Sequence, residues 1–222
     1  LYNEYKSEVK KFKFYGSLKQ SYYLKSKYNS SHIDKYDIAL LSEACPGWSK
    51  NFPGFEECVG QIANFTFKLA KKHNLKIKFV GKRRKDTSLY ERENKFYKKY
   101  LKENFFIDPN SKETFSSYVS TSQSKLIIGM VSTLLRENLG AGKKILSCNF
   151  TSDNRHDFPV DGICNLREEN FQEFEKRVLS ILQMSKSEYF KKLSKNKNYV
   201  MNFDHRNSAF DLISLRIKEL LI

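Results

Sequence analysis

The sequence predicts an α/β protein, built as a doubly wound, Rossmann-like parallel sheet of about six strands with helices on both faces. Two observations predict this class. Short apolar runs of strand length alternate along the chain with helical patterns of ten or more residues. Residues 126–129 carry no charge, as in a strand that is buried on both faces. We expect a single domain over residues 1–222.

Strands are expected in six segments. The first runs into a tight turn at Gly16 and Ser17, and a loop rich in glycine and proline follows the second. The third alternates apolar and charged residues, as a half-buried strand does. In chain order the expected strands are residues 13–16, 36–41, 75–81, 125–129, 144–148 and 160–164.

Helices are expected where apolar residues recur every three or four positions. In the longest such segment this spacing connects Val59, Ile62, Ala63, Phe67 and Ala70, which places them on one helix face. The expected helices are residues 55–73, 89–103, 114–120, 132–139, 168–184, 185–195 and 204–221.

The charge of the chain is strongly positive, because 40 Lys and Arg outnumber 25 Asp and Glu, for a net charge of +15. Such a chain attracts anions, which include nucleotide phosphates, nucleic acid and an anionic membrane surface. A solvated lysine-rich surface explains the charge as well, since 31 of the 40 basic residues are lysines spread along the chain. No helix-turn-helix, RRM or OB-fold signature is found, so nucleic acid is not an expected partner.

The four cysteines include no C-x-x-C pair, so zinc-site spacing is absent. We expect reduced, buried thiols of a cytosolic protein, with disulfides as the alternative. No apolar run reaches the roughly 18 residues that cross a bilayer. The chain begins at Leu1 with neither a methionine nor a signal peptide, and we expect a fragment of a longer protein.

Ligands of a doubly wound sheet bind at the carboxyl ends of its strands. This rule selects four loops, and each contains residue types that suit an anionic ligand. They are residues 16–17, 42–48, 81–85 and 130–133.

The strongest of these signals lies in residues 126–147. An apolar strand runs into Ser132 and Thr133, which suit the cap of a following helix. The N-terminus of that helix offers free N–H groups and a positive dipole end to a phosphate. Glu137 follows about one turn into the helix, where a carboxylate can accept hydrogen bonds from ribose hydroxyls. The alternative is an ordinary capped helix with Glu137 as a surface charge.

This order of strand, Ser-Thr pair, helix with a glutamate, glycine turn and second strand resembles the donor-site signature of GT-B glycosyltransferases. The rest of the chain is similar to the C-terminal half of that fold. The helical residues 170–174 and 184–189 resemble the last helices of enzymes that make bacterial surface polysaccharides. The resemblance is closest to capsule and lipopolysaccharide glycosyltransferases of the group that includes sialyl- and Kdo-transferases.

The resemblance implies a role for each matching position. Ser132 and Thr133 would hold the nucleotide phosphate, and Glu137 would hold the ribose. The tight turn would let the backbone approach the donor phosphates, and two basic residues after the third strand would neutralise the leaving group. The turn is formed by Gly16 and Ser17, and the basic pair is Lys82 and Arg83.

The resemblance also implies the partners. The donor would be a nucleotide-sugar and the acceptor a growing glycan, with no cofactor. No D-x-D motif is present, so no bound divalent cation is implied. In GT-B enzymes the catalytic base usually comes from the N-terminal half, and we expect that half to lie outside this chain. We therefore expect a cytoplasmic fragment of a metal-independent, two-domain glycosyltransferase with peripheral contact to the anionic inner membrane. The alternatives are a basic nucleic-acid-binding module and a non-catalytic domain that docks on a membrane.

Three further residues are candidates for the site. Glu43 follows the second expected strand and either faces the cleft or is a plain loop acid. Trp48 either stacks on a base or sugar or packs within its loop. His156, beside Arg155 and Asp157, is the histidine that merits testing as a site residue.

Overall fold

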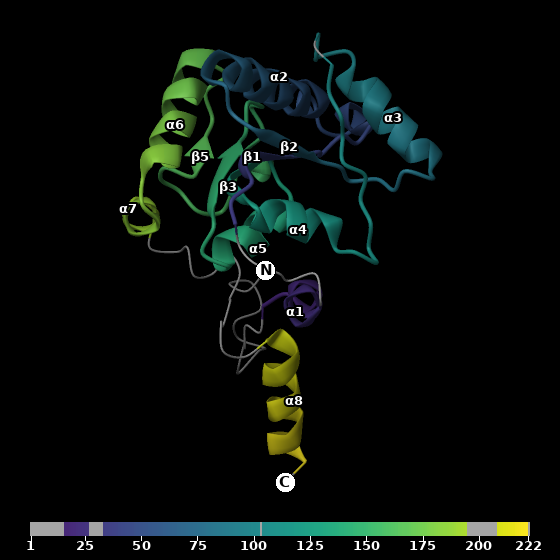
Figure 1. Ribbon diagram of the computed structural model, residues 1–222, viewed down its shortest axis with the longest axis vertical. Helices are drawn as coiled ribbons and strands as arrows, with labels where there is room; N and C mark the ends of the chain where they lie inside the picture. The colour runs from purple at the N-terminus through teal and green to yellow at the C-terminus, as the bar shows by residue number, and fades with distance from the viewer. Residues whose placement is uncertain (1–15, 27–32, 103, 195–207, 222) are drawn as a thin grey trace.

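The computed structural model describes residues 16–26, 33–102, 104–194 and 208–221. Within them the predicted class is confirmed: a parallel β-sheet with strand order β2-β1-β3-β4-β5 is flanked by helices on both faces (Figure 1). Five strands of this sheet lie in the described part of the chain, close to the expected number of about six. The strands are β1 (Tyr36–Leu41), β2 (Ile77–Val80), β3 (Ser124–Gly129), β4 (Lys144–Cys148) and β5 (Asn165–Leu166).

Two of the expected strands differ from the structure. Most of the segment 13–16 lies outside the described residues. The prediction of a strand at 160–164 is wrong, because Gly162 adopts a positive φ of 110° and its segment turns there. The backbone at Gly162 approaches Lys192 so closely that an added Cβ would lie 2.2 Å from its carbonyl oxygen. The last strand, β5, therefore starts after this turn.

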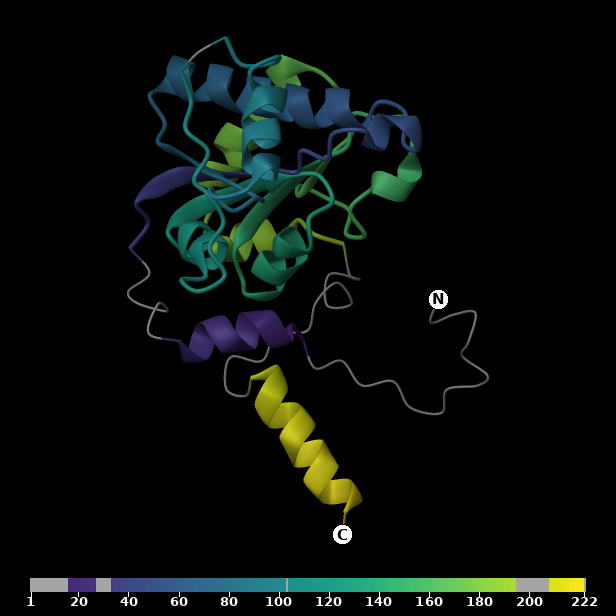
Figure 2. The same cartoon turned by 90° about the vertical axis from the view of Figure 1, so that its right-hand side faces the viewer.

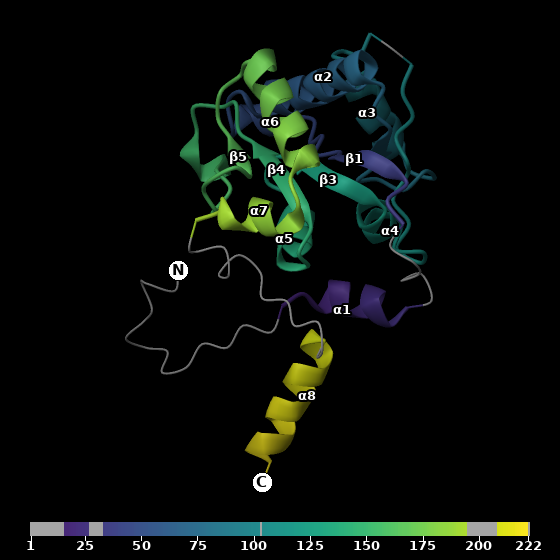
Figure 3. The same cartoon turned by 60° about the vertical axis from the view of Figure 1, so that its left-hand side comes forward.

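The helices form the layers around the sheet, with α2 and α6 on one face and α4 and α5 on the other (Figures 1 and 3). The segments expected as helices are found, with shifts of a few residues at most of their ends. The second expected helix, 89–103, already ends at Tyr97, and the fifth, sixth and last are also shorter than expected. The helices after α1 are α2 (Phe55–His73), α3 (Ser88–Tyr97), α4 (Ser116–Ser122), α5 (Thr133–Gly140), α6 (Phe171–Gln183), α7 (Lys186–Lys191) and α8 (Ala209–Leu220).

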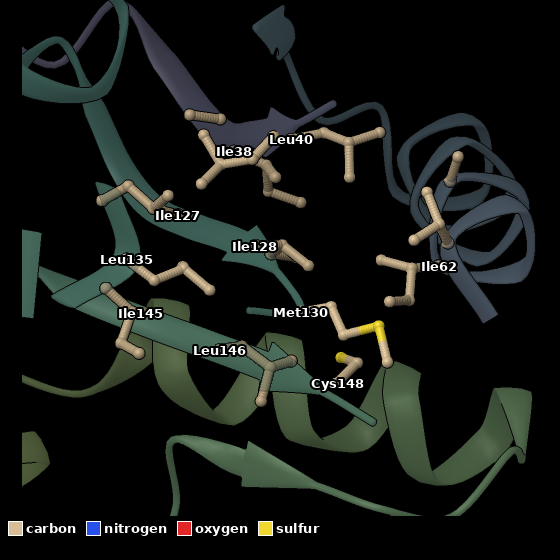
Figure 4. Packing of buried hydrophobic residues seen from close by; sticks show 14 of the residues in the cluster. Ile38, Leu40, Ile62, Ile127, Ile128, Met130, Leu135, Ile145, Leu146 and Cys148 are labelled. Atoms are coloured by element: carbon tan, nitrogen blue, oxygen red, sulfur yellow. The ribbon is translucent and has the colours of Figure 1, made fainter. Parts of the chain in front are cut away.

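The core lies between the sheet and its helices. Side chains of the central strands, such as Ile128 and Leu146, and of α2, such as Ile62, belong to one cluster of buried residues (Figure 4). The central strands β1 and β3 pair in parallel, with Ile38 opposite Leu126. Burial on both faces explains why β3 reads as an uninterrupted apolar run. The four cysteines are free and buried, as expected.

One helix, α1 (Leu18–Lys25), was not expected. The side chain of Ser17 caps it by accepting the N–H of Gln20 at 3.2 Å. A serine followed three residues later by glutamine is the sequence pattern of a capping box, which was the available signal. In three views α8 extends away from the sheet beside α1 (Figures 1, 2 and 3). An ion pair of 2.7 Å between Lys25 and Asp211 joins the two helices.

Among the described residues, no helix combines the length and the apolar character that a membrane crossing needs.

Candidate functional site

The candidate site is a cleft at the carboxyl ends of β1 and β3. The chain passes from β1 to β2 on one side and from β3 to β4 on the other, so these two strands flank the point where the winding reverses. Open α/β sheets bind ligands at that point. The cleft has a volume of about 410 Å³ and is lined by the loops after β1, β2 and β3, together with residues of α1, α4 and α5.

Most of the predicted site residues meet here. Lys82, Ser132, Thr133 and Glu137 line the cleft. Ser17 reaches a residue of the cleft, because its hydroxyl donates a hydrogen bond of 2.5 Å to the carboxylate of Glu137. Sequence positions 120 residues apart are thus brought together, as the resemblance implied.

The two remaining predicted residues lie beside the cleft. Gly16 precedes the Ser17 cap with a φ of 85°, a left-handed conformation that favours glycine. Arg83 does not line the cleft itself; it lines a smaller hollow that shares Trp48 with the cleft.

The start of α5 is formed as the sequence predicted. The Ser132 hydroxyl accepts the N–H of Leu134 at 3.2 Å and so caps the helix. Thr133 is the first residue of the helix. The positive end of the α5 dipole therefore faces the cleft that the Lys82 side chain also lines.

A buried carboxylate already binds backbone N–H groups just before the start of α5. Glu43, 6% exposed, accepts the N–H of Val131 at 3.0 Å and also that of Met130. A Cβ added at Gly129 would lie 3.3 Å from a Glu43 oxygen, so glycine leaves room for the carboxylate. Burial raises the pKa of Glu43, an effect that the hydrogen bonds from the 130–132 backbone and the nearby Lys82 charge oppose. Glu43 thus faces the cleft and is not a plain loop acid.

Glu137 is buried as well, with 7% of its surface exposed. Its carboxylate accepts hydrogen bonds from Ser17 and, at 2.9 Å, from the Tyr118 hydroxyl. The pKa of Tyr118 is raised by burial and by the adjacent Glu137 charge. The reading of Glu137 as a surface charge is therefore wrong.

A third buried glutamate was missed by the sequence analysis. Glu93 of α3 accepts the Lys82 N–H at 2.9 Å, the Arg83 N–H at 3.3 Å and the hydroxyl of Ser42. It lies in a strongly charged helix, and nothing in the sequence distinguishes it from its exposed neighbours. Each of the glutamates Glu43, Glu93 and Glu137 thus holds a different segment at this edge.

The wall of the cleft away from α5 is aromatic. Trp48 lines the cleft with 45% of its surface exposed, and its ring centroid lies 5.2 Å from that of Phe55. The Lys82 ammonium lies 5.8 Å from the Trp48 ring centroid and 2.9 Å from the Cys45 sulfur. Trp48 thus packs on aromatic residues of its own region and also borders the cleft. Its stacking on a base or sugar stays a prediction.

His156 is a packing residue. It is 6% exposed and its ring contacts Phe52 and Phe55 edge-on, with centroids 5.3 and 5.2 Å apart. It is not among the residues that line the cleft. Within the described part of the chain, no group of three or more His, Cys, Asp or Glu residues is arranged to hold a metal ion.

The fold and the cleft define a doubly wound α/β protein with a cleft, the candidate ligand site, at its topological switch point. Residues 61–218 match the model of a family described as "putative O-antigen biosynthesis protein". The match covers more than half of the chain, so the chain belongs to this family. The chain matches no curated protein. Because O-antigen is a surface polysaccharide, the family agrees with the expected role in surface-polysaccharide synthesis.

Proposed function

We propose that the chain is the nucleotide-sugar-binding half of a metal-independent GT-B glycosyltransferase of O-antigen synthesis. The observation that carries the proposal is the convergence of Ser132, Thr133, Glu137 and Lys82 in one cleft at the switch point. Family membership supports the polysaccharide pathway. The resemblance to GT-B enzymes and the residue types that line the cleft support the proposed donor and transfer reaction.

The donor phosphates would bind at the start of α5. Glu43 accepts the N–H groups of Met130 and Val131, so the phosphate would lie further out, at the hydroxyls of Ser132 and Thr133. The Lys82 ammonium, on the opposite wall, would neutralise the charge that develops on the leaving nucleotide. The flexible side chain of Lys82 would let its ammonium stay close to the leaving phosphate as the glycosidic bond breaks.

The ribose would bind at Glu137. Its carboxylate is held by Ser17 and Tyr118, both hydroxyl donors, so it is already oriented to accept hydrogen bonds from hydroxyl groups. A ribose diol would add to or replace these donors. Trp48 and Phe55 supply an apolar wall against which a base or sugar ring can pack. The acceptor glycan and the catalytic base would come from outside this chain.

The peripheral contact with an anionic membrane is a further part of this proposal. It rests on the net charge of +15 and on apolar side chains that α8 leaves exposed, among them Leu215, Ile217 and Leu220. Sedimentation with anionic and with neutral vesicles, at low and high salt, tests it. Binding that needs anionic lipid and weakens with salt is expected.

Donor binding is tested by the melting temperature of the chain with UDP, GDP, ADP and CMP, because a ligand of the folded state must raise it. We expect one nucleotide to stabilise the protein and Lys82→Met to weaken its binding about tenfold. Lys85→Met is the matched control, since Lys85 is an exposed lysine of the same loop outside the cleft. The proposal fails if no nucleotide stabilises the chain, or if both variants bind it equally well.

A further inference from the structure

A small hollow adjoins the cleft at Cys45 and Trp48. It has a volume of about 90 Å³ and shares Cys45 and Trp48 with the cleft as common walls. Arg83 from the loop after β2 and Arg92 from α3 line it, together with the apolar Pro46 and Leu89. The site therefore joins two arginines to the aromatic wall of the donor cleft.

The two arginines differ from most others in the described part of the chain. Four arginines form ion pairs with carboxylates, namely Arg84, Arg155, Arg167 and Arg216. A fifth, Arg177, donates to the backbone carbonyls of Ile163 and Asn165. Among the described residues no carboxylate pairs with the guanidinium of Arg83 or of Arg92. A charged, planar donor fork is thus available at each of them.

Glu93 also lines the hollow, so its charge must be counted. Its carboxylate is engaged by the backbone N–H groups of Lys82 and Arg83 and by the Ser42 hydroxyl. It holds the backbone at Arg83 and leaves the guanidinium unpaired. Two positive charges against one negative charge leave the hollow net positive.

The chemistry of the hollow suits one small anionic group. A guanidinium fork matches the geometry of a carboxylate or a phosphate, to which it can donate two parallel hydrogen bonds. A volume of about 90 Å³ accommodates such a group but not a sugar ring. Any ring that carries the group would then lie against Trp48, whose face also borders the donor cleft.

We infer that this hollow binds the carboxylate or phosphate substituent of an acidic sugar, with Arg83 and Arg92 as its two ligands and Trp48 as the platform for the ring. The inference rests on the proposed function, since it makes the hollow a substrate subsite of the same cleft. It assigns Arg83 to a substituent of the sugar and leaves Lys82 alone to neutralise the leaving nucleotide. The enzyme would therefore select a charged sugar over a neutral one.

The test follows the side-chain Nε–H signals of the arginines by NMR while the chain is titrated with inorganic phosphate, glucuronate and glucose. We expect the signals of Arg83 and Arg92 to move with at least one of the two anions and not with glucose. The double substitution R83Q/R92Q should weaken that binding about tenfold. Arg84→Gln, in the same loop, is the control and should leave it unchanged, because Arg84 is already paired with Asp86.

Movement with glucuronate identifies a carboxylate as the bound group, and movement with phosphate alone identifies a phosphate. The inference is overturned if both signals stay in place, or if R83Q/R92Q binds the anions as the unchanged chain does. Nucleotide binding, measured in parallel, separates the two proposals. Nucleotide binding without anion binding at the arginines defeats this inference only. The reverse result defeats the proposed donor site, and with it the assignment of the hollow as a sugar subsite, but leaves Arg83 and Arg92 as ligands of an anion.

Discussion

The two edges of the sheet bury opposite charges. At the carboxyl edge, which forms the cleft, the buried charges are glutamates such as Glu43, whose carboxylate accepts backbone N–H groups. At the amino edge the buried charge is Lys144, 8% exposed, whose ammonium donates to the backbone carbonyls of Ile181, Leu182 and Met184 at 2.6, 3.1 and 2.8 Å. Beside it Lys143 donates to the carbonyl of Ser122 at 2.6 Å.

The difference follows from the direction of the helices. Helices of a parallel α/β sheet run opposite to its strands, so their N-termini gather at the carboxyl edge and their C-termini at the amino edge. Free N–H groups at the one edge need acceptors, and free C=O groups at the other need donors. Both buried charges suffer desolvation, which raises the pKa of Glu43 and lowers that of Lys144. Although the chain has a net charge of +15, buried glutamates thus hold the loops at the carboxyl edge of the sheet.

The largest effect is expected at the amino edge. Lys144→Met removes the donor to three carbonyls at the end of α6, and leaves them buried without partners. We expect a loss of about 3 kcal/mol in the free energy of unfolding, measured by urea denaturation. Lys125→Met is the control: Lys125 is exposed and pairs with Asp37 on the surface, so its loss should cost under about 1 kcal/mol. Equal losses would show that burial does not distinguish the two lysines.

The next effect, at the carboxyl edge, depends on pH. Burial raises the pKa of the Glu43 carboxyl above its ordinary value of about 4.5. Between the ordinary and the raised pKa, the folded chain keeps the Glu43 proton while the unfolded chain has released it. The free energy of unfolding therefore falls as pH rises through this range. Glu43→Gln mimics the protonated form, so this variant should gain stability relative to the unchanged chain as pH rises.

Urea denaturation of both proteins between about pH 4 and 8 measures that gain. Glu188→Gln provides a control of opposite sign, because hydrogen bonds from Ser185 lower the pKa of Glu188 and its contribution is lost as pH falls. If the stability difference between Glu43→Gln and the unchanged chain did not vary with pH, the carboxyl of Glu43 would not titrate differently in the folded state.

The predictability of the molecule from its sequence also differs between regions. The helix α2 has the predicted residues, because its apolar spacing, its acidic start at Glu56 and its basic end are all local signals. The Ser132 cap was equally local. Glu43 and Glu93 bind backbone groups of loops distant in sequence, and no spacing rule encodes such contacts. The family resemblance placed Ser17 and Glu137 in one donor site, but the hydrogen bond between them, across 120 residues of sequence, was not predicted.

The smallest effect tests whether the glutamates at the cleft are held by their donors. Tyr118→Phe removes one of the two hydroxyl groups that donate to the Glu137 carboxylate and leaves the 2.5 Å hydrogen bond from Ser17 in place. The carboxylate keeps one strong partner and borders the cleft, so water can replace the lost donor. We expect a loss of about 1 kcal/mol in the free energy of unfolding. Tyr22→Phe, at a 57% exposed tyrosine of α1, should cost less than half as much. Should both variants be equally stable, the carboxyl edge would not depend on its hydroxyl donors, and Glu137 would be held by the packing of α5 alone.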